Sequence, residues 1–138
     1  MRLSKEFFAE LSWWEDNLST RNGIPLIRPL QPVEATISGT DASNIGCGSV
    51  VWMSGGREEY KQFWSDAERK FPINMRELIG ATRILENWGP RLKNKRVILE
   101  TDNMATVWCI RRRHARTELM AEQLRRLYAV ATQWGIEL

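Results

Sequence analysis

The segment Val33-Glu-Ala-Thr-Ile-Ser-Gly-Thr-Asp41 alternates apolar or small residues with polar ones and ends on an aspartate. Alternation with a period of two is typical of a β-strand that buries one face. The glycine-punctuated run Ala42-Ser-Asn-Ile-Gly-Cys-Gly48 follows directly, which predicts a tight connection to a second strand. We therefore expect a strand over Val33–Thr40 with Asp41 at its end.

Two further carboxylates stand out, one at the end of another strand-like run and one at the start of a helical pattern. Asp102 ends the strand-like run Arg96-Val-Ile-Leu-Glu-Thr-Asp102 and precedes a helix that opens with Asn103. Glu77 lies in Ile73-Asn-Met-Arg-Glu77-Leu-Ile-Gly-Ala, at the start of a helical pattern. Two strand-end acids and a first-turn helix acid can meet above one sheet. Because close carboxylates repel one another and raise each other's pKa, such a cluster indicates bound cations, and oxygen ligands favour Mg²⁺ or Mn²⁺.

Each of the three acids also has a purely structural interpretation. Glu77 follows Asn74 by three residues, which is the spacing of a capping box at a helix start. Asp41 is compatible with a turn before a glycine loop, and Asp102 with the positive end of a helix dipole. The coincidence of all three favours a metal site.

The remaining pattern predicts alternating strands and helices in one mixed sheet. Ser54-Gly55-Gly56 indicates a hairpin, and Gly89-Pro90 and Gly135 end helical stretches. Ile136–Leu138 predicts the beginning of a fifth strand. The other expected elements are a helix over Ser4–Leu18, strands over Gly46–Met53, Glu58–Trp64 and Arg96–Thr101, and helices over Asn74–Trp88, from Asn103 and from about Thr117.

Three motifs in this order resemble the ribonuclease H fold, and most closely the RNase H domains of retroelement polyproteins. They are Thr40-Asp41-Ala-Ser43 with Gly46 and Gly48, then Asn74-Met-Arg-Glu77-Leu, then Thr101-Asp102-Asn103. A weaker match, Trp13-Trp14-Glu-Asp-Asn17, is similar to the segment between polymerase and RNase H in DIRS-type elements. The resemblance implies an α/β fold, with strands one to three antiparallel, strand four and a short strand five parallel to strand one, and helices on both faces.

The resemblance also implies an activity and its residues. RNase H enzymes hydrolyse the RNA strand of an RNA–DNA hybrid with two Mg²⁺ ions, for which Mn²⁺ can substitute. Asp41, Glu77 and Asp102 match the metal-binding and catalytic carboxylates, with Asp41 bridging both ions. The expected contacts to the hybrid come from Ser43, Asn44, Asn74 and Asn103, in the region where the family reads sugar 2′-hydroxyls. Ser43 and Asn74 are equally compatible with turn and cap roles.

The sequence departs from the family pattern at its C-terminal end. RNase H proteins usually continue past strand five into a loop with a histidine and a helix with a fourth aspartate. Such a region would begin after Leu138, and His114, the single histidine, does not match that position. We therefore expect an RNase H-like domain over 33–138 that lacks the last helix, and a weakened second metal site. A polymerase domain or a second chain is a possible source of the missing part.

Basic and aromatic residues add further expectations. The run Arg111-Arg-Arg-His-Ala-Arg116 is either a solvated loop or, through Arg111, Arg112 and Arg113, a contact to hybrid phosphates. Residues 1–32 are expected to form a separate N-terminal helix followed by a linker with prolines at 25, 29 and 32. The tryptophans expected in the core are Trp52, Trp88, Trp108 and Trp134.

Composition limits the classes of protein that fit. A length of 138 residues with 43% apolar residues suffices for one domain with a real core. No apolar stretch reaches the roughly 18 residues of a membrane span, and two cysteines without metal-like spacing indicate a reducing compartment. We expect an intracellular protein, cytoplasmic or nuclear, without a membrane partner. It is either an RNase H endonuclease of a reverse-transcribing element, or a non-catalytic module of the same origin that binds nucleic acid or protein.

Overall fold

The computed structural model describes residues 3–21, 35–53 and 55–138, and it divides the chain into the units Met1–Pro32 and Val33–Leu138. The described part of the first unit is helix α1, Lys5–Arg21, which begins after Ser4, whose hydroxyl accepts a hydrogen bond from the Phe7 amide. The expected proline linker lies outside the described residues. None of the helices described has the length and apolar character that a membrane crossing requires.

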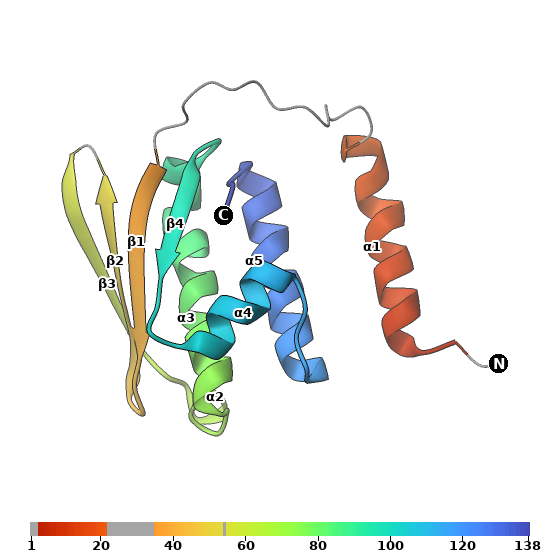
Figure 1. Ribbon diagram of the computed structural model, residues 1–138, viewed down its shortest axis with the longest axis horizontal. Helices are drawn as coiled ribbons and strands as arrows, with labels where there is room; N and C mark the ends of the chain where they lie inside the picture. The colour runs from red at the N-terminus through yellow and green to blue at the C-terminus, as the bar shows by residue number, and fades with distance from the viewer. Residues whose placement is uncertain (1–2, 22–34, 54) are drawn as a thin grey trace. The chain divides into compact units, whose positions relative to one another are not determined.

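The second unit contains a mixed sheet with the strand order β3-β2-β1-β4. β1 pairs antiparallel with β2 and parallel with β4, while β2 pairs antiparallel with β3 (Figure 1). This arrangement confirms the predicted α/β fold with a mixed sheet. The elements are β1 Ala35–Ala42, β2 Gly46–Met53, β3 Gly56–Phe63, α2 Asp66–Arg69, α3 Ile73–Trp88, the 3₁₀ helix η1 Gly89–Leu92, β4 Arg96–Glu100, α4 Met104–Arg112 and α5 Glu118–Trp134.

Strand boundaries differ from the prediction because of backbone pairing. Asp41 belongs to β1 instead of following it, since it pairs with Gly48 of β2. The absence of a side chain at Gly46 lets β3 approach, because a Cβ there would lie 2.3 Å from the Gln62 carbonyl oxygen. The fifth strand is reduced to a single parallel bridge between Arg96 and Glu137.

Helix α2 was not predicted, because its signal is short and local. Ser65 and Glu68 form a capping box, in which the Ser65 hydroxyl accepts from the Glu68 amide and the Glu68 carboxylate accepts from the Ser65 amide. Such a box stabilises a single turn without the apolar stripe that identifies longer helices.

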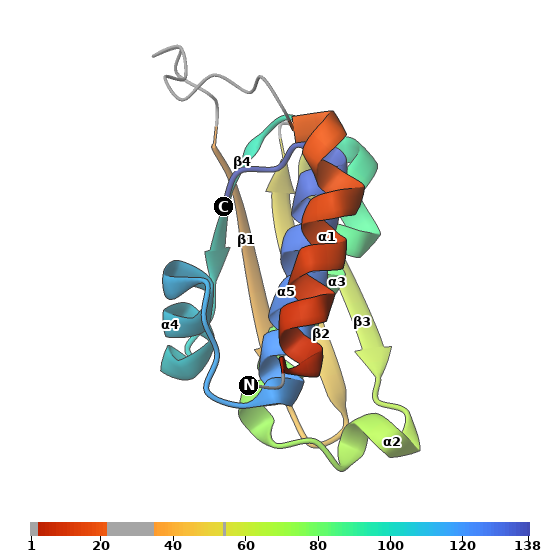
Figure 2. The ribbon, with the colours of Figure 1, turned by 90° about the vertical axis from the view of Figure 1, so that its right-hand side faces the viewer.

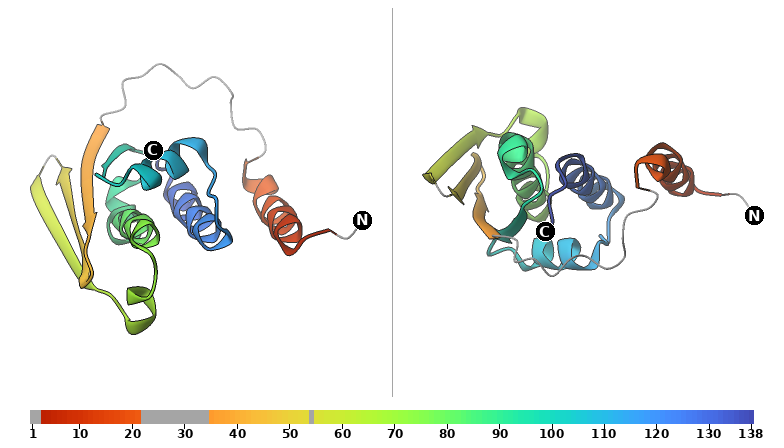
Figure 3. Two further views of the ribbon diagram at one scale, coloured as in Figure 1. Left: turned by 60° about the horizontal axis from the view of Figure 1, so that its bottom comes forward. Right: turned by 90° about the horizontal axis from the view of Figure 1, so that it is seen from above.

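Helix α3 packs directly on the sheet, and α5 lies behind it on the same side (Figure 3). The predicted inner stripe of α3, Met75, Leu78, Ile79, Thr82 and Leu85, is buried throughout. α4 lies beyond the β4 edge of the sheet (Figure 2). The small hydroxyl side chains of β1 that are buried face α3. The helix lies so close to β1 at Gly80 that a Cβ there would lie 2.7 Å from the Thr40 hydroxyl oxygen.

Two expectations about the sheet surfaces were wrong. Within residues 35–53 and 55–138, the helices do not cover both faces: Trp52 and Ile98, on the face opposite α3, are 44% and 45% exposed. Trp108 is exposed as well, whereas Trp88 is buried and Trp134 half-buried. The alternating pattern identified strands and helices correctly but did not reveal which face receives a helix, because that depends on the crossover connections.

Close packing of α3 on β1 gives a stability prediction. Gly80→Ala should lower the free energy of unfolding by about 1–2 kcal/mol, because overpacking against Thr40 outweighs the gain in helix propensity. Removing the obstructing hydroxyl with Thr40→Ala should make the same substitution neutral or stabilising. Urea unfolding of the four proteins measures this, with Gly48→Ala as the control, since a Cβ at Gly48 meets nothing within 4 Å. Additive effects would contradict the contact.

Candidate metal centre

The three predicted carboxylates meet at one end of the β1–β4 pair. Gly39 of β1 pairs with Glu100 of β4, so continuing the same register by two residues brings Asp41 beside Asp102. Glu77 reaches them from the second turn of α3, which packs across β1. One carboxylate oxygen from each of the three lies within 4.8 Å of the other two.

Glu77 is the buried member of the group, at 3% exposure, whereas Asp41 and Asp102 are exposed. Its Oε1 accepts a hydrogen bond from the Ala42 amide at 3.0 Å, and its Oε2 accepts one from the Thr101 hydroxyl at 3.4 Å. Both donors adjoin the other two acids in sequence. Glu77 is therefore oriented by the same strand ends that carry Asp41 and Asp102.

The capping interpretation of Glu77 was wrong. The residue at the N-cap of α3 is Pro72, and no side chain caps the helix by a hydrogen bond. The side-chain oxygen of Asn74 instead accepts a hydrogen bond from the side-chain nitrogen Nδ2 of Asn103 at 2.9 Å. This contact joins the starts of α3 and α4. Asn103 is the N-cap of α4, where its side-chain oxygen accepts from the Thr106 amide.

Electrostatics of the group favour a bound cation. Burial raises the pKa of Glu77 above its ordinary 4.5 against the lowering effect of the Ala42 amide, and the charges of Asp41 and Asp102 raise it further. Among the residues that the structure describes, none forms an ion pair with these three acids, and no fourth acid joins the group. Three oxygen ligands with clustered negative charge fit a hard divalent cation.

The other predicted site residues fall into two places. Ser43 and Asn44 lie exposed in the turn between β1 and β2, next to Asp41. The Ser43 hydroxyl is occupied inside this turn, since it accepts from the amides of Ile45 and Gly46 and contacts the Gly46 carbonyl oxygen. The turn role anticipated for Ser43 is thus observed, and its hydroxyl has little capacity left for a ligand.

The arginine run lies at the far end of α4. Arg111 and Arg112 end the helix and Arg113 caps it in the left-handed conformation at φ 52°. The guanidinium of Arg112 lies 4.7 Å from the centre of the Trp108 ring, and that of Arg113 lies 5.1 Å from the Tyr128 ring. All three arginines are exposed, and none of them forms an ion pair with an acid in the part of the chain that the structure describes.

Two residues near the site were missed as participants. Thr101 and Arg76 both stand inside the quoted motifs, but only the tertiary structure shows what their side chains contact. Arg76 is 7% exposed and donates to the Ser43 carbonyl oxygen and the Asn44 side chain. An arginine directly before a helix glutamate gives no sign in the sequence that it is buried.

Comparison with known proteins agrees with this architecture. A family model described as the RNase H-like domain found in reverse transcriptase matches residues 32–129. The N-terminal RNase H domain of a Mycobacterium tuberculosis protein, solved as a fusion with maltose-binding protein, superposes with a TM-score of 0.60 at 18% identity, covering 75% of this chain and 83% of that one. RNase H1 of Halobacterium salinarum gives 0.56 at 13% identity, covering 75% and 82%. No curated protein matches the chain.

The buried Glu77 predicts an unusual pH dependence in metal-free protein. Its pKa is higher in the folded state than in the unfolded chain, so folding takes up a proton as the pH falls from neutral towards 4.5. The free energy of unfolding should therefore rise over this range, and Glu77→Gln should remove the rise. Urea unfolding in a chelator, compared between wild type and variant, measures it. Mg²⁺ should flatten the wild-type curve, and parallel curves for the two proteins would contradict the prediction.

Proposed function

This chain belongs to the family of RNase H-like domains found in reverse transcriptase, and on that premise we propose that it hydrolyses the RNA strand of RNA–DNA hybrids with divalent metal ions. The observation that carries the proposal is the convergence of Asp41, Glu77 and Asp102 within 4.8 Å. We propose further that the chain acts inside the cell as part of a reverse-transcribing element, beside a polymerase domain.

The acids would share the work according to their surroundings. Asp41 and Asp102, both exposed, would ligate ions at the solvent side, while buried Glu77 is oriented by two hydrogen bonds. Mg²⁺ held by these three carboxylates, or Mn²⁺ in its place, would activate a water molecule and stabilise negative charge on the leaving 3′ oxygen. Because the described group has three acids, we expect the second of two ions to bind more weakly.

Side chains around the acids are suited to a nucleic-acid backbone. Asn44 and Asn74 carry amide groups three residues from Asp41 and Glu77 in the sequence, and Asn103 holds Asn74 in place by a hydrogen bond. The exposed Arg111, Arg112 and Arg113 offer positive charge on α4. Phosphates carry most of the affinity in such interfaces, whereas contacts to 2′-hydroxyls distinguish RNA from DNA.

Cleavage of a labelled hybrid tests the proposal. The wild type should cut the RNA strand in Mg²⁺ or Mn²⁺ and leave 3′-hydroxyl ends. Asp41→Asn should reduce the rate at least about 100-fold, because it removes a charged ligand at the point where the acids meet. Asp66→Asn, which neutralises an exposed acid of α2, is the matched control and should retain activity.

The same experiment separates the enzyme from a non-catalytic module. Hybrid binding that is indifferent to metal, with no cleavage in either ion, would support a binding scaffold of the same family. Cleavage that persists in Asp41→Asn would show that the activity arises elsewhere and would contradict the assignment of this site.

The arginines of α4 give a prediction about salt. Arg112→Ala should weaken hybrid binding and reduce the slope of log affinity against log salt concentration by about one, as expected for one lost phosphate contact. Arg57→Ala removes an exposed arginine on β3, at the opposite edge of the sheet from α4, and should leave the slope unchanged. Fluorescence anisotropy across a salt series measures both, and equal slopes for the two variants would identify the Arg112 contribution as non-specific.

A further inference from the structure

A buried arginine of α3, Arg76, donates hydrogen bonds to the turn between β1 and β2. Arg76 Nη1 donates to the Ser43 carbonyl oxygen at 2.8 Å, and Nη2 donates to Asn44 Oδ1 at 3.2 Å. The side chain comes from α3, directly before Glu77, and is 7% exposed. One guanidinium therefore hydrogen-bonds to two successive residues, Ser43 and Asn44, in the turn that follows Asp41.

Burying a neutral side chain at position 76 would cost less free energy than burying an arginine. Among the described residues no carboxylate pairs with Arg76, and its Nε has no hydrogen-bond partner. Burying a charge without a counter-charge costs free energy, and a buried donor without a partner adds to that cost. Stability alone is thus a weak explanation for an arginine here, whereas its planar fork is well suited to fixing the geometry of a turn.

The chemistry of the guanidinium fixes the orientation of Asn44. Arginine has five N–H donors and no acceptor, so the atom of Asn44 that it contacts must be the amide oxygen. The amide nitrogen of Asn44 then remains for a ligand, on an exposed residue three positions after Asp41. Asn44 is held as a hydrogen-bond donor.

The same reasoning applies to Asn74, in the first turn of α3. The Thr106 amide donates to Asn103 Oδ1, so the Asn103 contact to Asn74 comes from its nitrogen and must end on the Asn74 oxygen. Asn74 consequently also presents its nitrogen as a donor. Both amides near the carboxylates are oriented by groups that can only donate to them.

We propose that Arg76 is a positioning residue, which orients the Asn44 amide as a donor to an oxygen acceptor on the RNA strand, either a 2′-hydroxyl or a phosphodiester oxygen. The inference rests on the proposed function for its ligand. Arg76 acts through the turn and through Asn44, without touching the reacting atoms.

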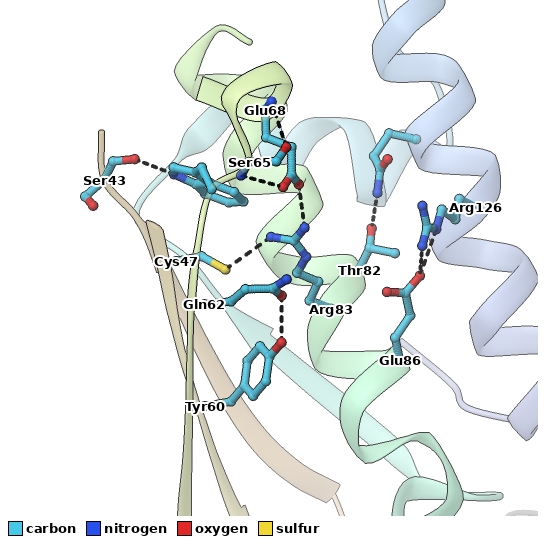
Figure 4. A network of polar contacts seen from close by, with 12 residues as sticks. Ser43, Cys47, Tyr60, Gln62, Ser65, Glu68, Thr82, Arg83, Glu86 and Arg126 are labelled. Carbon is cyan, nitrogen blue, oxygen red and sulfur yellow. Dashed lines mark hydrogen bonds and ion pairs between the residues drawn. The ribbon is translucent and has the colours of Figure 1, made fainter. Parts of the chain in front are cut away.

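Arg76→Met is a usable test because the turn keeps other support. The Ser43 carbonyl oxygen also accepts from the Trp64 indole nitrogen at 2.7 Å, and Figure 4 shows this contact at the end of a network that includes Arg83. Trp64 is 3% exposed, and the Arg83 guanidinium lies 5.1 Å from its ring. Losing the Arg76 side chain therefore leaves no orphaned carbonyl, and exposed Asn44 can turn to water.

The experiment measures cleavage kinetics together with hybrid affinity in a chelator, where catalysis plays no part. Arg76→Met and Asn44→Ala should each raise KM and the dissociation constant roughly 3- to 10-fold, the value of one hydrogen bond, with kcat nearly unchanged. The double variant should lose no more than either single one, since both remove the same contact. Arg76→Lys should recover part of the loss.

Two further variants exclude trivial causes. Asn44→Asp should be as stable as wild type to urea, because its carboxylate pairs with Arg76, yet should bind at least as weakly as Asn44→Ala because the donor is gone. Arg126→Met removes an arginine that pairs with Glu86 away from the turn, and controls for the loss of one positive charge (Figure 4). It should leave KM unchanged.

Single 2′-deoxy substitutions along the RNA strand identify the acceptor. If it is a 2′-hydroxyl, one position should weaken wild-type binding but not binding by Asn44→Ala or Arg76→Met. If the acceptor is a phosphodiester oxygen, each 2′-deoxy substitution should change the affinity of the variants by the same factor as that of the wild type. The variants should still bind every hybrid more weakly than the wild type does.

Several outcomes would overturn the inference. If wild type cleaves the hybrid but Arg76→Met and Asn44→Ala leave KM and affinity unchanged, the positioning role of Arg76 is contradicted and the proposed function is not. A fall in kcat at constant KM would place the effect of Arg76 on the carboxylates instead of on binding. Wild type that binds the hybrid but does not cleave it would contradict the proposed function only, because the affinities still judge Arg76. Failure of the wild type to bind the hybrid would contradict both.

Discussion

The parallel pairing of β1 with β4 is the constraint on which the site depends. Parallel neighbours carry their carboxyl ends to the same edge of a sheet, so the pairing of Gly39 with Glu100 brings Asp41 and Asp102 together although they are far apart in sequence. The connection between these strands must cross the sheet, and it contains α3. Gly80, set against Thr40, lets that helix approach closely enough for Glu77 to reach both strand ends.

Burial and repulsion at this edge act against the stability of the fold. Glu77 lies in the interior with two carboxylates beside it, and burial together with these neighbours raises its pKa. The hydrogen bonds from Ala42 and Thr101 offset only part of that cost. A divalent cation bound by the three carboxylates would replace their mutual repulsion with attraction to the ion, and would offset the cost of burying Glu77.

Polar groups around the acids are fixed by what each partner can donate or accept. Arg76 and the Thr106 amide have donors only, and their contacts propagate outward to leave the amide nitrogens of Asn44 and Asn74 for a ligand. The Ser43 hydroxyl, by contrast, is used up within its own turn. Residues that are adjacent in one motif thus have different tasks, as a turn former and as an oriented donor.

Sequence by itself determined the longer strands and helices and the three acids, because periodicity, glycine and proline act locally. The bounds of β2 and the buried stripe of α3 follow from these local signals, whereas the single turn α2 did not. Tertiary structure decided what depends on pairing and crossover. It placed Asp41 inside β1, reduced the fifth strand to a bridge at Glu137 and left Trp52 on an open face. It also buried Arg76, since whether a charged side chain faces solvent or a turn depends on which distant backbone groups lie within its reach.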